Sequence, residues 1–199
     1  MTQRLVLDWD GTCTEVDGLH MILERFGDLE LYRRVEGALG NGLTLHEVIS
    51  AEIGTVTLPL ERAAEWVREN VTLRAGFHEL AARYRPVIVS SGFHELIDPV
   101  LAREGVELEV LANSLDARSD GWLPLWRDGA ICAACGEPCK RSVVSGEPYV
   151  YVGDGYSDRC AALAADRVFA RDGLARWLDA EGVGYEPYDD LRDVLATLA

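Results

Sequence analysis

Short apolar runs alternate with stretches of helical periodicity along most of the chain. The runs at 4–7, 86–90, 106–111, 149–152 and 167–170 predict five buried strands. Amphipathic segments separate most of these runs, which predicts right-handed crossovers and a parallel sheet covered by helices on both faces. The pattern therefore predicts an α/β fold with a doubly wound, Rossmann-like sheet.

Two segments depart from this alternation. From Leu19 to Asn70 the apolar residues recur at helical spacing, and glycines at 37, 40, 42 and 54 divide the segment into about four helices. Residues 113–148 contain a stretch at 121–126 that predicts a hairpin, followed by a cysteine-rich stretch. A long segment without regular structure inside a compact domain is more often functional than not.

Length, net charge and cysteine content limit the kinds of partner and the cellular location that we expect for this protein. The 199 residues suffice for one globular domain with an inserted sub-domain. A net charge of −15 repels phosphate backbones and anionic lipids, so we expect neither nucleic acid nor a membrane as a partner. No apolar run approaches the roughly 18 residues that cross a bilayer, and the start lacks a secretory apolar region, which predicts a cytoplasmic location. The five cysteines, an odd number, do not resemble a disulfide framework.

Polar side chains stand at the ends of three predicted strands. Asp8 and Asp10 follow the first, Ser90 ends the second, and Asp154 and Asp158 follow the fourth. Each group alone is typical of a turn or a helix cap, but in a doubly wound sheet the carboxyl ends of the strands meet at one edge. Four carboxylates in one crevice repel one another unless a cation neutralises them, and oxygen ligands favour Mg²⁺.

These residues belong to a longer series of motifs. The series resembles, in order, the four motifs of the haloacid dehalogenase superfamily of phosphatases: Asp8-x-Asp10-Gly11-Thr12, Ser90, Lys140 and Gly153-Asp154-Gly155-x-x-Asp158. Within the phosphoserine-phosphatase-like branch, a closer resemblance is to the 2-hydroxy-3-keto-5-methylthiopentenyl-1-phosphate phosphatases of methionine salvage. That resemblance rests on Leu73-Arg74-x-Gly76-Phe77, Ser90-Ser91-Gly92-Phe93, Cys139-Lys140 and residues 168–172. Ser91 stands where many relatives have glycine, and Ser157 where phosphoserine phosphatases have asparagine, so the substrate stays open.

The resemblance implies a domain organisation and a reaction. The helical segment would be a cap of residues 17–73, inserted into a core formed by residues 1–16 and 74–199. The reaction would be the Mg²⁺-dependent hydrolysis of a small-molecule phosphate monoester through an aspartyl-phosphate. Phosphoserine or another small metabolite would be the alternative substrate, and the enzyme would be a monomer or a homodimer.

The resemblance also implies roles for single residues. Asp8 would be the nucleophile, Asp10 the general acid and base, and Lys140 the cation that faces the phosphate. Lys140 is the only lysine among 19 basic residues, which argues against an ordinary surface lysine. The metal ligands would be Asp8, the backbone carbonyl of Asp10, Asp154 and Asp158, and the phosphate would be held by Ser90 and the N–H groups of Ser91, Gly11 and Thr12.

Other interpretations stay open beside these. Asp17 would either face the substrate or cap a helix. The spacing Cys132-x-x-Cys135-x-x-x-Cys139 supplies three zinc ligands and needs a fourth, such as Cys13 or a histidine, so simple packing is the plainer interpretation. A mutase or a phospho-receiver switch would also use an aspartate acceptor, but a receiver needs neither a second carboxylate two residues on nor a substrate lid.

Overall fold

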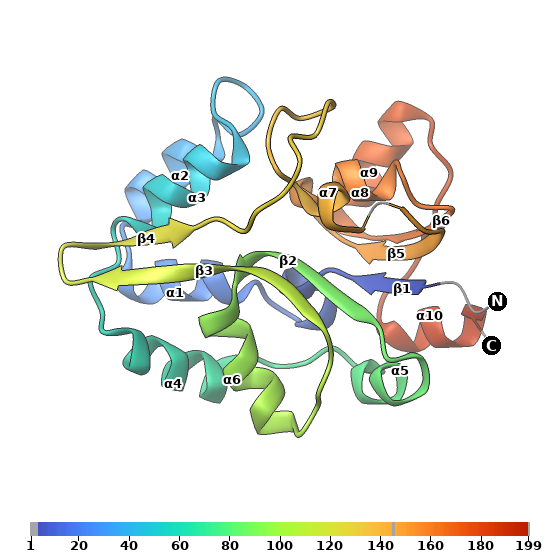
Figure 1. Cartoon of the computed structure of the whole chain (residues 1–199), viewed down its shortest axis with the longest axis horizontal. Coiled ribbons are helices and arrows are strands. Elements are labelled where there is room, and N and C mark those ends of the chain that lie inside the picture. The colour runs from blue at the N-terminus through green and yellow to red at the C-terminus, as the bar shows by residue number, and fades with distance from the viewer. Residues whose placement is uncertain (1–3, 145, 199) are drawn as a thin grey trace.

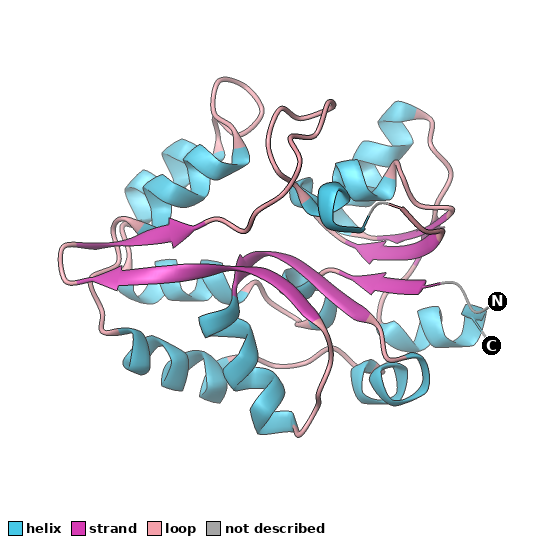
Figure 2. Cartoon of the chain, viewed as in Figure 1, coloured by secondary structure: helices cyan, strands magenta, loops and turns pink. Residues whose placement is uncertain are grey.

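A seven-stranded sheet forms the centre of the molecule in the computed structural model, which describes residues 4–144 and 146–198 (Figures 1 and 2). The strand order is β4-β3-β2-β1-β5-β6-β7, and every neighbouring pair is parallel except β3 and β4. The strands are β1 (Arg4–Leu7), β2 (Val87–Phe93), β3 (Val110–Arg118), β4 (Gly121–Leu125), β5 (Tyr149–Gly153), β6 (Arg167–Ala170) and β7 (Glu186–Pro187). The expected doubly wound α/β fold is thus confirmed.

Helices cover both faces of this sheet, because successive strand residues point to opposite sides. In β1, Leu5 and Leu7 pack into one apolar cluster while Val6 packs into the other. The first cluster lies under α1 (Gly18–Phe26), α4 (Leu60–Asn70), α5 (Phe77–Tyr84), α6 (His94–Glu104) and α10 (Leu191–Leu198), and the second under α7 (Lys140–Val144), α8 (Arg159–Ala162) and α9 (Asp172–Glu181). None of the helices in the described part of the chain is long and apolar enough to cross a membrane.

Most predicted elements form, with one displaced strand. Four of the five predicted strands correspond to β1, β2, β5 and β6, and the stretch at 121–126 forms the expected hairpin with β3. The third strand begins at Val110 instead of residue 106. Val106 and Leu108 are partly buried and pack against the core, but they do not pair in the sheet. Their apolar side chains therefore cover the core and do not indicate a strand. The two-residue strand β7 was too short to be predicted from the sequence.

The strand order opens a crevice beside β1. The chain moves outward from β1 through β2 to β3, then returns to β5 on the other side of β1 and moves outward again to β6 and β7. Loops that leave the carboxyl ends of β1 and β5 therefore diverge, which is where ligands bind in such sheets. The four helices predicted between the first two strands are present: α1, α2 (Leu29–Glu36), α3 (Leu45–Ile53) and α4. Among them α4 packs against α6, while α2 and α3 lie together on the opposite side of the β3–β4 hairpin (Figure 1).

Candidate active site

The loop that follows β1 carries the first motif. Asp8 is 4% exposed, and its N–H donates to the carbonyl of Val152 on the adjoining strand β5 at 2.9 Å. Residues 9–13 then form a single tight turn in which Gly11 has a φ of +76°, a conformation that favours glycine. A Cβ atom at Gly11 would also lie 2.4 Å from Oδ2 of Asp154. The glycine therefore lets the two acidic loops approach each other.

An arginine far along the chain holds this loop in place. The Nε of Arg74 donates to the carbonyl of Thr12 at 3.0 Å, and its Nη2 donates to the carbonyls of Gly11 and Thr14 at 2.6 and 3.1 Å. A planar guanidinium with several fixed donors suits this task better than a lysine ammonium. The sequence offered Arg74 only as part of a resemblance, and its role as a clamp on the motif becomes visible in the fold.

Lys140 lies at the centre of the acidic cluster. It is 1% exposed, and its Nζ donates to Oδ1 of Asp8 and, at 2.6 Å, to Oδ1 of Asp158. Burial by itself lowers the pKa of Lys140, but the charges of Asp158 and Asp8 outweigh burial and raise that pKa above the ordinary value. The side chain is therefore a permanent cation next to Asp8.

Asp158 is held by protein donors on both of its carboxylate oxygens. Besides Lys140, its Oδ1 accepts from the hydroxyl of Tyr151 at 2.6 Å, and its Oδ2 accepts from the N–H groups of Asp154 and Gly155 at 2.9 and 2.8 Å. The side chain is fully buried. These contacts fix the loop that follows β5 and the position of Lys140. Tyr151 takes part in them through its hydroxyl, and nothing in the sequence indicated this role.

The donor set fits a divalent cation. Carboxylate oxygens of Asp8, Asp154 and Asp158 all lie within 4.8 Å of one another. Burial and the charge of Asp158 raise the pKa of Asp8 well above its usual range and that of Asp154 to about 6, so Lys140 does not fully offset the negative charge. Hard oxygen ligands with excess negative charge suit Mg²⁺. Asp8 and Asp154 would hold the ion, because both oxygens of Asp158 already have protein partners.

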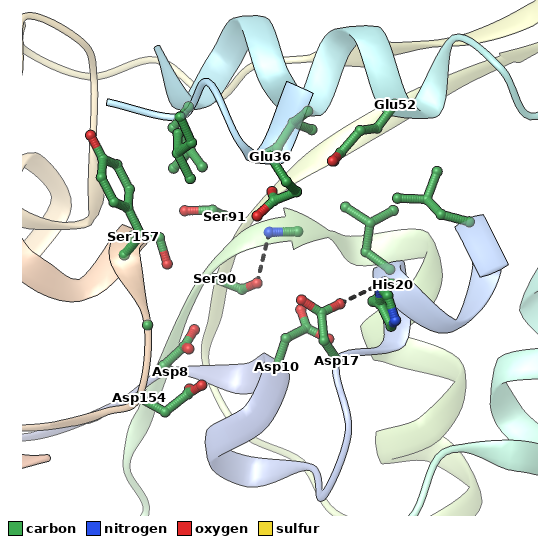
Figure 3. Close-up of a pocket in the computed structure, with 18 of the residues that line it drawn as sticks. Asp8, Asp10, Asp17, His20, Glu36, Glu52, Ser90, Ser91, Asp154 and Ser157 are labelled. Atoms are coloured by element: carbon green, nitrogen blue, oxygen red, sulfur yellow. Dashed lines mark hydrogen bonds between the residues drawn. The ribbon is translucent and has the colours of Figure 1, made fainter. Parts of the chain in front are cut away.

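Asp10 lies between the start of α1 and strand β2. Its Oδ1 accepts from the N–H of Gly18 at 2.8 Å, and a Cβ atom at Gly92 would lie 3.1 Å from its Oδ2 and 3.1 Å from Oγ of Ser90. The free carboxyl oxygen therefore points toward the end of β2, where Ser90 is 1% exposed (Figure 3). Burial and the charge of Asp17 raise the pKa of Asp10 well above its usual range. A carboxyl whose pKa is raised holds its proton to a higher pH than usual, which suits a general acid.

A cavity of about 210 Å³ joins these residues to the inserted helices (Figure 3). The lining contributed by residues 17–52 is mixed: leucines and an isoleucine stand beside the acids Asp17, Glu36 and Glu52. Glu52 is 3% exposed, its Oε1 has no hydrogen-bond partner, and burial together with the charge of Glu36 raises its pKa to about 8. Among the described residues that line the cavity there is no arginine. The apolar residues of this part of the lining are Leu19, Leu23, Leu39, Leu45 and Ile49.

The structure brings most of the predicted site residues to this cavity. Those that line it are Asp8, Asp10, Asp17, Ser90, Ser91, Lys140 and Asp154. Asp17 lines the cavity and also caps α1, accepting from the N–H of His20 at 2.8 Å, so its two interpretations are compatible.

Gly11, Thr12 and Asp158 are not among the lining residues. The N–H of Gly11 donates to Oγ1 of Thr14 at 3.1 Å, and the hydroxyl of Thr12 donates to Oδ1 of Asp154 at 2.7 Å. Their phosphate contacts, and the metal contacts of Asp158 and of the Asp10 carbonyl, remain predictions. Glu36 and Glu52 were missed, although Glu52 carried a signal: it is a charged residue on the buried face of an amphipathic helix.

Comparisons with known proteins show which proteins this chain is similar to. No family model matches the chain. The chain is 26% identical to the 2-hydroxy-3-keto-5-methylthiopentenyl-1-phosphate phosphatase of Exiguobacterium sp. strain AT1b, over 98% of this chain and 97% of that protein. It is also 26% identical to the protein of that name from Bacillus mycoides, over 100% and 96%.

Solved structures with the same fold include two of phosphoserine phosphatase. One holds a phospho-aspartyl intermediate analogue (TM-score 0.72, 19% identity, covering 100% of this chain and 99% of the other). The other is a substrate complex (TM-score 0.74, 16% identity, the same coverage). The chain is therefore similar over its full length to 2-hydroxy-3-keto-5-methylthiopentenyl-1-phosphate phosphatases in sequence, and it shares the fold of phosphoserine phosphatases.

Proposed function

We propose that this chain is a Mg²⁺-dependent phosphatase that hydrolyses a small-molecule phosphate monoester through an aspartyl-phosphate on Asp8. One observation carries the proposal: side chains from four separate segments of the chain converge on one cavity. These side chains are Asp8, Asp10, Ser90, Lys140 and Asp154, and each suits a different requirement of phosphoryl transfer. The acidic charge of the chain and its expected cytoplasmic location agree with a metabolite as substrate.

The first half of the reaction would form the phosphoenzyme. Ser90 would donate to a phosphoryl oxygen, and the ammonium of Lys140 would offset the charge of the phosphoryl group. An oxygen of Asp8 would bond to phosphorus as the bond between phosphorus and the ester oxygen breaks. Asp10 would give its proton to the departing ester oxygen, so the leaving group departs as a neutral alcohol.

The second half would release phosphate. Asp10, now a carboxylate, would take a proton from a water molecule whose oxygen bonds to phosphorus as the bond to Asp8 breaks. Inorganic phosphate would leave, and both carboxyl groups would return to their starting states. Bound Mg²⁺ would supply positive charge that lets Asp8 approach a phosphate dianion. Arg74 and Asp158 would keep the two acidic loops in register throughout.

The cavity favours a leaving group without charge. Phosphoserine carries a carboxylate, yet no described arginine lines the cavity, and the inserted helices add further acids to its wall. Apolar side chains beside Glu36 and Glu52 suit a leaving group with an apolar part and hydroxyl or keto oxygens. The curated relatives are named for such a compound, in which the phosphate is joined to a hydroxy-keto chain with a methylthio group. We therefore propose a role in methionine salvage in preference to phosphoserine hydrolysis.

Phosphate release from a panel of phosphate monoesters would test both parts of the proposal. The panel would contain 2-hydroxy-3-keto-5-methylthiopentenyl-1-phosphate, phosphoserine and a sugar phosphate, each with Mg²⁺, and the Asp8→Asn variant would serve as the control without a nucleophile. We expect kcat/KM to be at least about tenfold higher for the uncharged leaving group, which equals about 1.4 kcal/mol. A preference for phosphoserine would refute the substrate class alone. Lack of catalytic turnover on every ester, with or without stoichiometric phosphorylation of Asp8, would refute the phosphatase assignment.

A further inference from the structure

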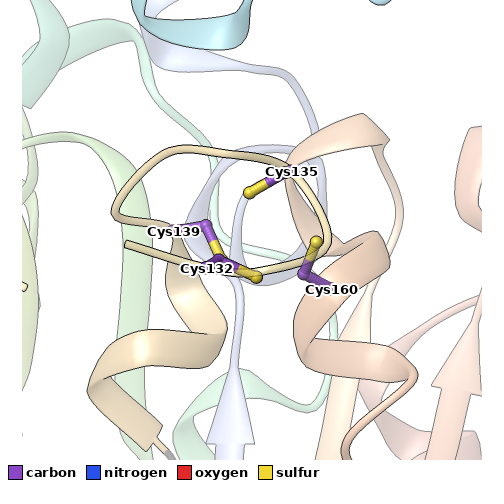
Figure 4. A group of neighbouring side chains, drawn as sticks. All are labelled: Cys132, Cys135, Cys139 and Cys160. Carbon is purple, nitrogen blue, oxygen red and sulfur yellow. The ribbon is translucent and has the colours of Figure 1, made fainter. Parts of the chain in front are cut away.

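Four cysteines gather outside the catalytic cavity (Figure 4). Cys132, Cys135 and Cys139 come from the loop between β4 and α7, and Cys160 comes from α8. Their sulfur atoms all lie within 4.8 Å of one another. All four are free thiols in the structure. From the sequence, Cys13 or a histidine was the candidate for the fourth ligand. In the structure Cys160 takes that place, and Cys13 is not in the cluster because its thiol donates to the carbonyl of Asp8 at 3.0 Å.

Backbone hydrogen bonds and a glycine turn shape the loop that carries three of these cysteines. The N–H of Gly136 donates to the carbonyl of Cys132 at 2.8 Å, and the N–H of Cys132 donates to the carbonyl of Glu137 at 3.0 Å. Gly136 has a φ of +78°, which closes a tight turn directly after Cys135. Spacings of two to four residues between paired cysteines, with such a turn, are typical of metal-binding loops.

We propose that these four cysteines bind one Zn²⁺ ion as a closed structural site. Four sulfurs at about 2.3 Å from a tetrahedral zinc ion are about 3.8 Å apart, so distances between the observed sulfurs, all within 4.8 Å, would shorten by at most about 1 Å. Soft thiolates favour zinc over the hard Mg²⁺ that suits the carboxylate site. All four positions of the ion would be filled by protein, which leaves no place for a substrate or an activated water. Arg127 and Arg159 line the neighbouring cavity together with Cys139 and Cys160, and they would offset the net negative charge of four thiolates on one Zn²⁺.

The proposed ion would connect the segments that carry Lys140 and Asp158, which form a buried ion pair. Cys139 immediately precedes Lys140, and Cys160 is two residues after Asp158, the carboxylate that Lys140 contacts. The same loop also contacts α3, because the N–H of His46 donates to Oε1 of Glu137 at 3.3 Å. No helix or strand lies between β4 and α7, so a metal ion would cross-link a segment that regular secondary structure does not hold. This positioning effect on Lys140 rests on the proposed phosphatase function, whereas the binding of zinc does not.

Metal content tests the site directly. The full chain, produced with zinc in the medium and purified without chelators, should contain about one zinc ion per chain, and titration with a thiol-specific mercurial should release it at about four equivalents. Cys160→Ser and Cys135→Ser should lose the ion, while Cys13→Ser, the matched control, should retain it. Less than about 0.1 zinc per chain in the unaltered protein would overturn the proposal. So would iron with strong visible absorption, or a mass that shows disulfides between these cysteines.

A second measurement avoids reliance on variants that fold poorly. Exchange of the bound ion for Co²⁺ in the unaltered chain should give the intense visible bands of tetrahedral thiolate coordination. A weak spectrum typical of oxygen ligation would contradict the proposal. If zinc holds Lys140 in place, its removal should lower kcat about 10- to 100-fold at saturating Mg²⁺. A chain that binds zinc but hydrolyses no ester would support the zinc site and refute the proposed function. An active chain without zinc would support the proposed function and refute the zinc site.

Discussion

Removing the charge of Lys140 is the most informative single change in this molecule. Lys140→Met keeps most of the length of the side chain but leaves Asp8 and Asp158 without the cation that both contact. Loss of one partner of a buried ion pair costs about 3–5 kcal/mol in the free energy of unfolding. Loss of one preorganised electrostatic contact to a transition state lowers kcat by about 10²–10³. We expect both losses at once, since the same ammonium serves folding and catalysis.

The loss of stability should depend on pH in a defined direction. Burial and the charge of Asp158 already raise the pKa of Asp8, and the charge of Lys140 opposes that rise. Without Lys140 the pKa of Asp8 rises further, so the native variant holds a proton that the unfolded chain releases above about pH 4. Stability of the variant therefore falls as pH rises, and its deficit relative to the unaltered protein should be larger at about pH 8 than at about pH 5.

Urea unfolding, followed through the fluorescence of the five tryptophans, measures the stability, and Mg²⁺-dependent phosphate release measures the rate. Arg141→Met is the matched control, because Arg141 is an exposed cation on the same helix, and it should change kcat less than about twofold. A Lys140→Met protein with kcat within about threefold of the unaltered enzyme would refute the catalytic reasoning. Loss of stability alone would leave Lys140 with a purely structural role.

Three further predictions address the proposed acid, the proposed metal ion and the helices between β1 and β2. Asp10→Asn should lower kcat/KM, which reports formation of the phosphoenzyme, by about 10²–10⁴ on alkyl phosphates but much less on p-nitrophenyl phosphate, whose leaving group needs no proton; equal losses of kcat/KM on both esters would contradict the role of acid. Brief treatment with EDTA should abolish phosphate release, and Mg²⁺ but not Ca²⁺ should restore it because Ca²⁺ coordinates more loosely; full activity after chelation would exclude the metal. Glu52→Gln should raise the free energy of unfolding by about 1–3 kcal/mol at about pH 9 and leave it unchanged at about pH 4. The reason is that Glu52 ionises at its ordinary pKa of 4.5 in the unfolded chain and at a pKa of about 8 in the folded one, so the free energy that its ionisation costs the folded state grows between these two pH values. A stability difference that does not depend on pH would refute this reasoning.

The sequence by itself determined the elements and the type of site. Short apolar runs separated by amphipathic segments are sufficient for a parallel sheet, because burial on both faces leaves few other arrangements. The polar residues at the strand ends, Asp8, Ser90 and Asp154, had to meet once β2, β1 and β5 became neighbours. The displaced start of β3 shows the limit of this reasoning: an apolar run can cover the core without pairing in a sheet, and Val106 does so.

Only the tertiary structure decided which side chains work together. Lys140 pairs with Asp8 across 132 positions of the chain, and Arg74 reaches the carbonyl of Thr12 across 62. Cys160 completes a cluster whose other members lie more than twenty positions earlier, a distance at which residue spacing carries no signal. Contacts of this kind depend on the path of the backbone between the partners and on how the helices pack against the sheet. A local pattern of residue types contains neither kind of information. The sequence therefore predicted the type of chemistry, and the tertiary structure decided which side chains contact one another.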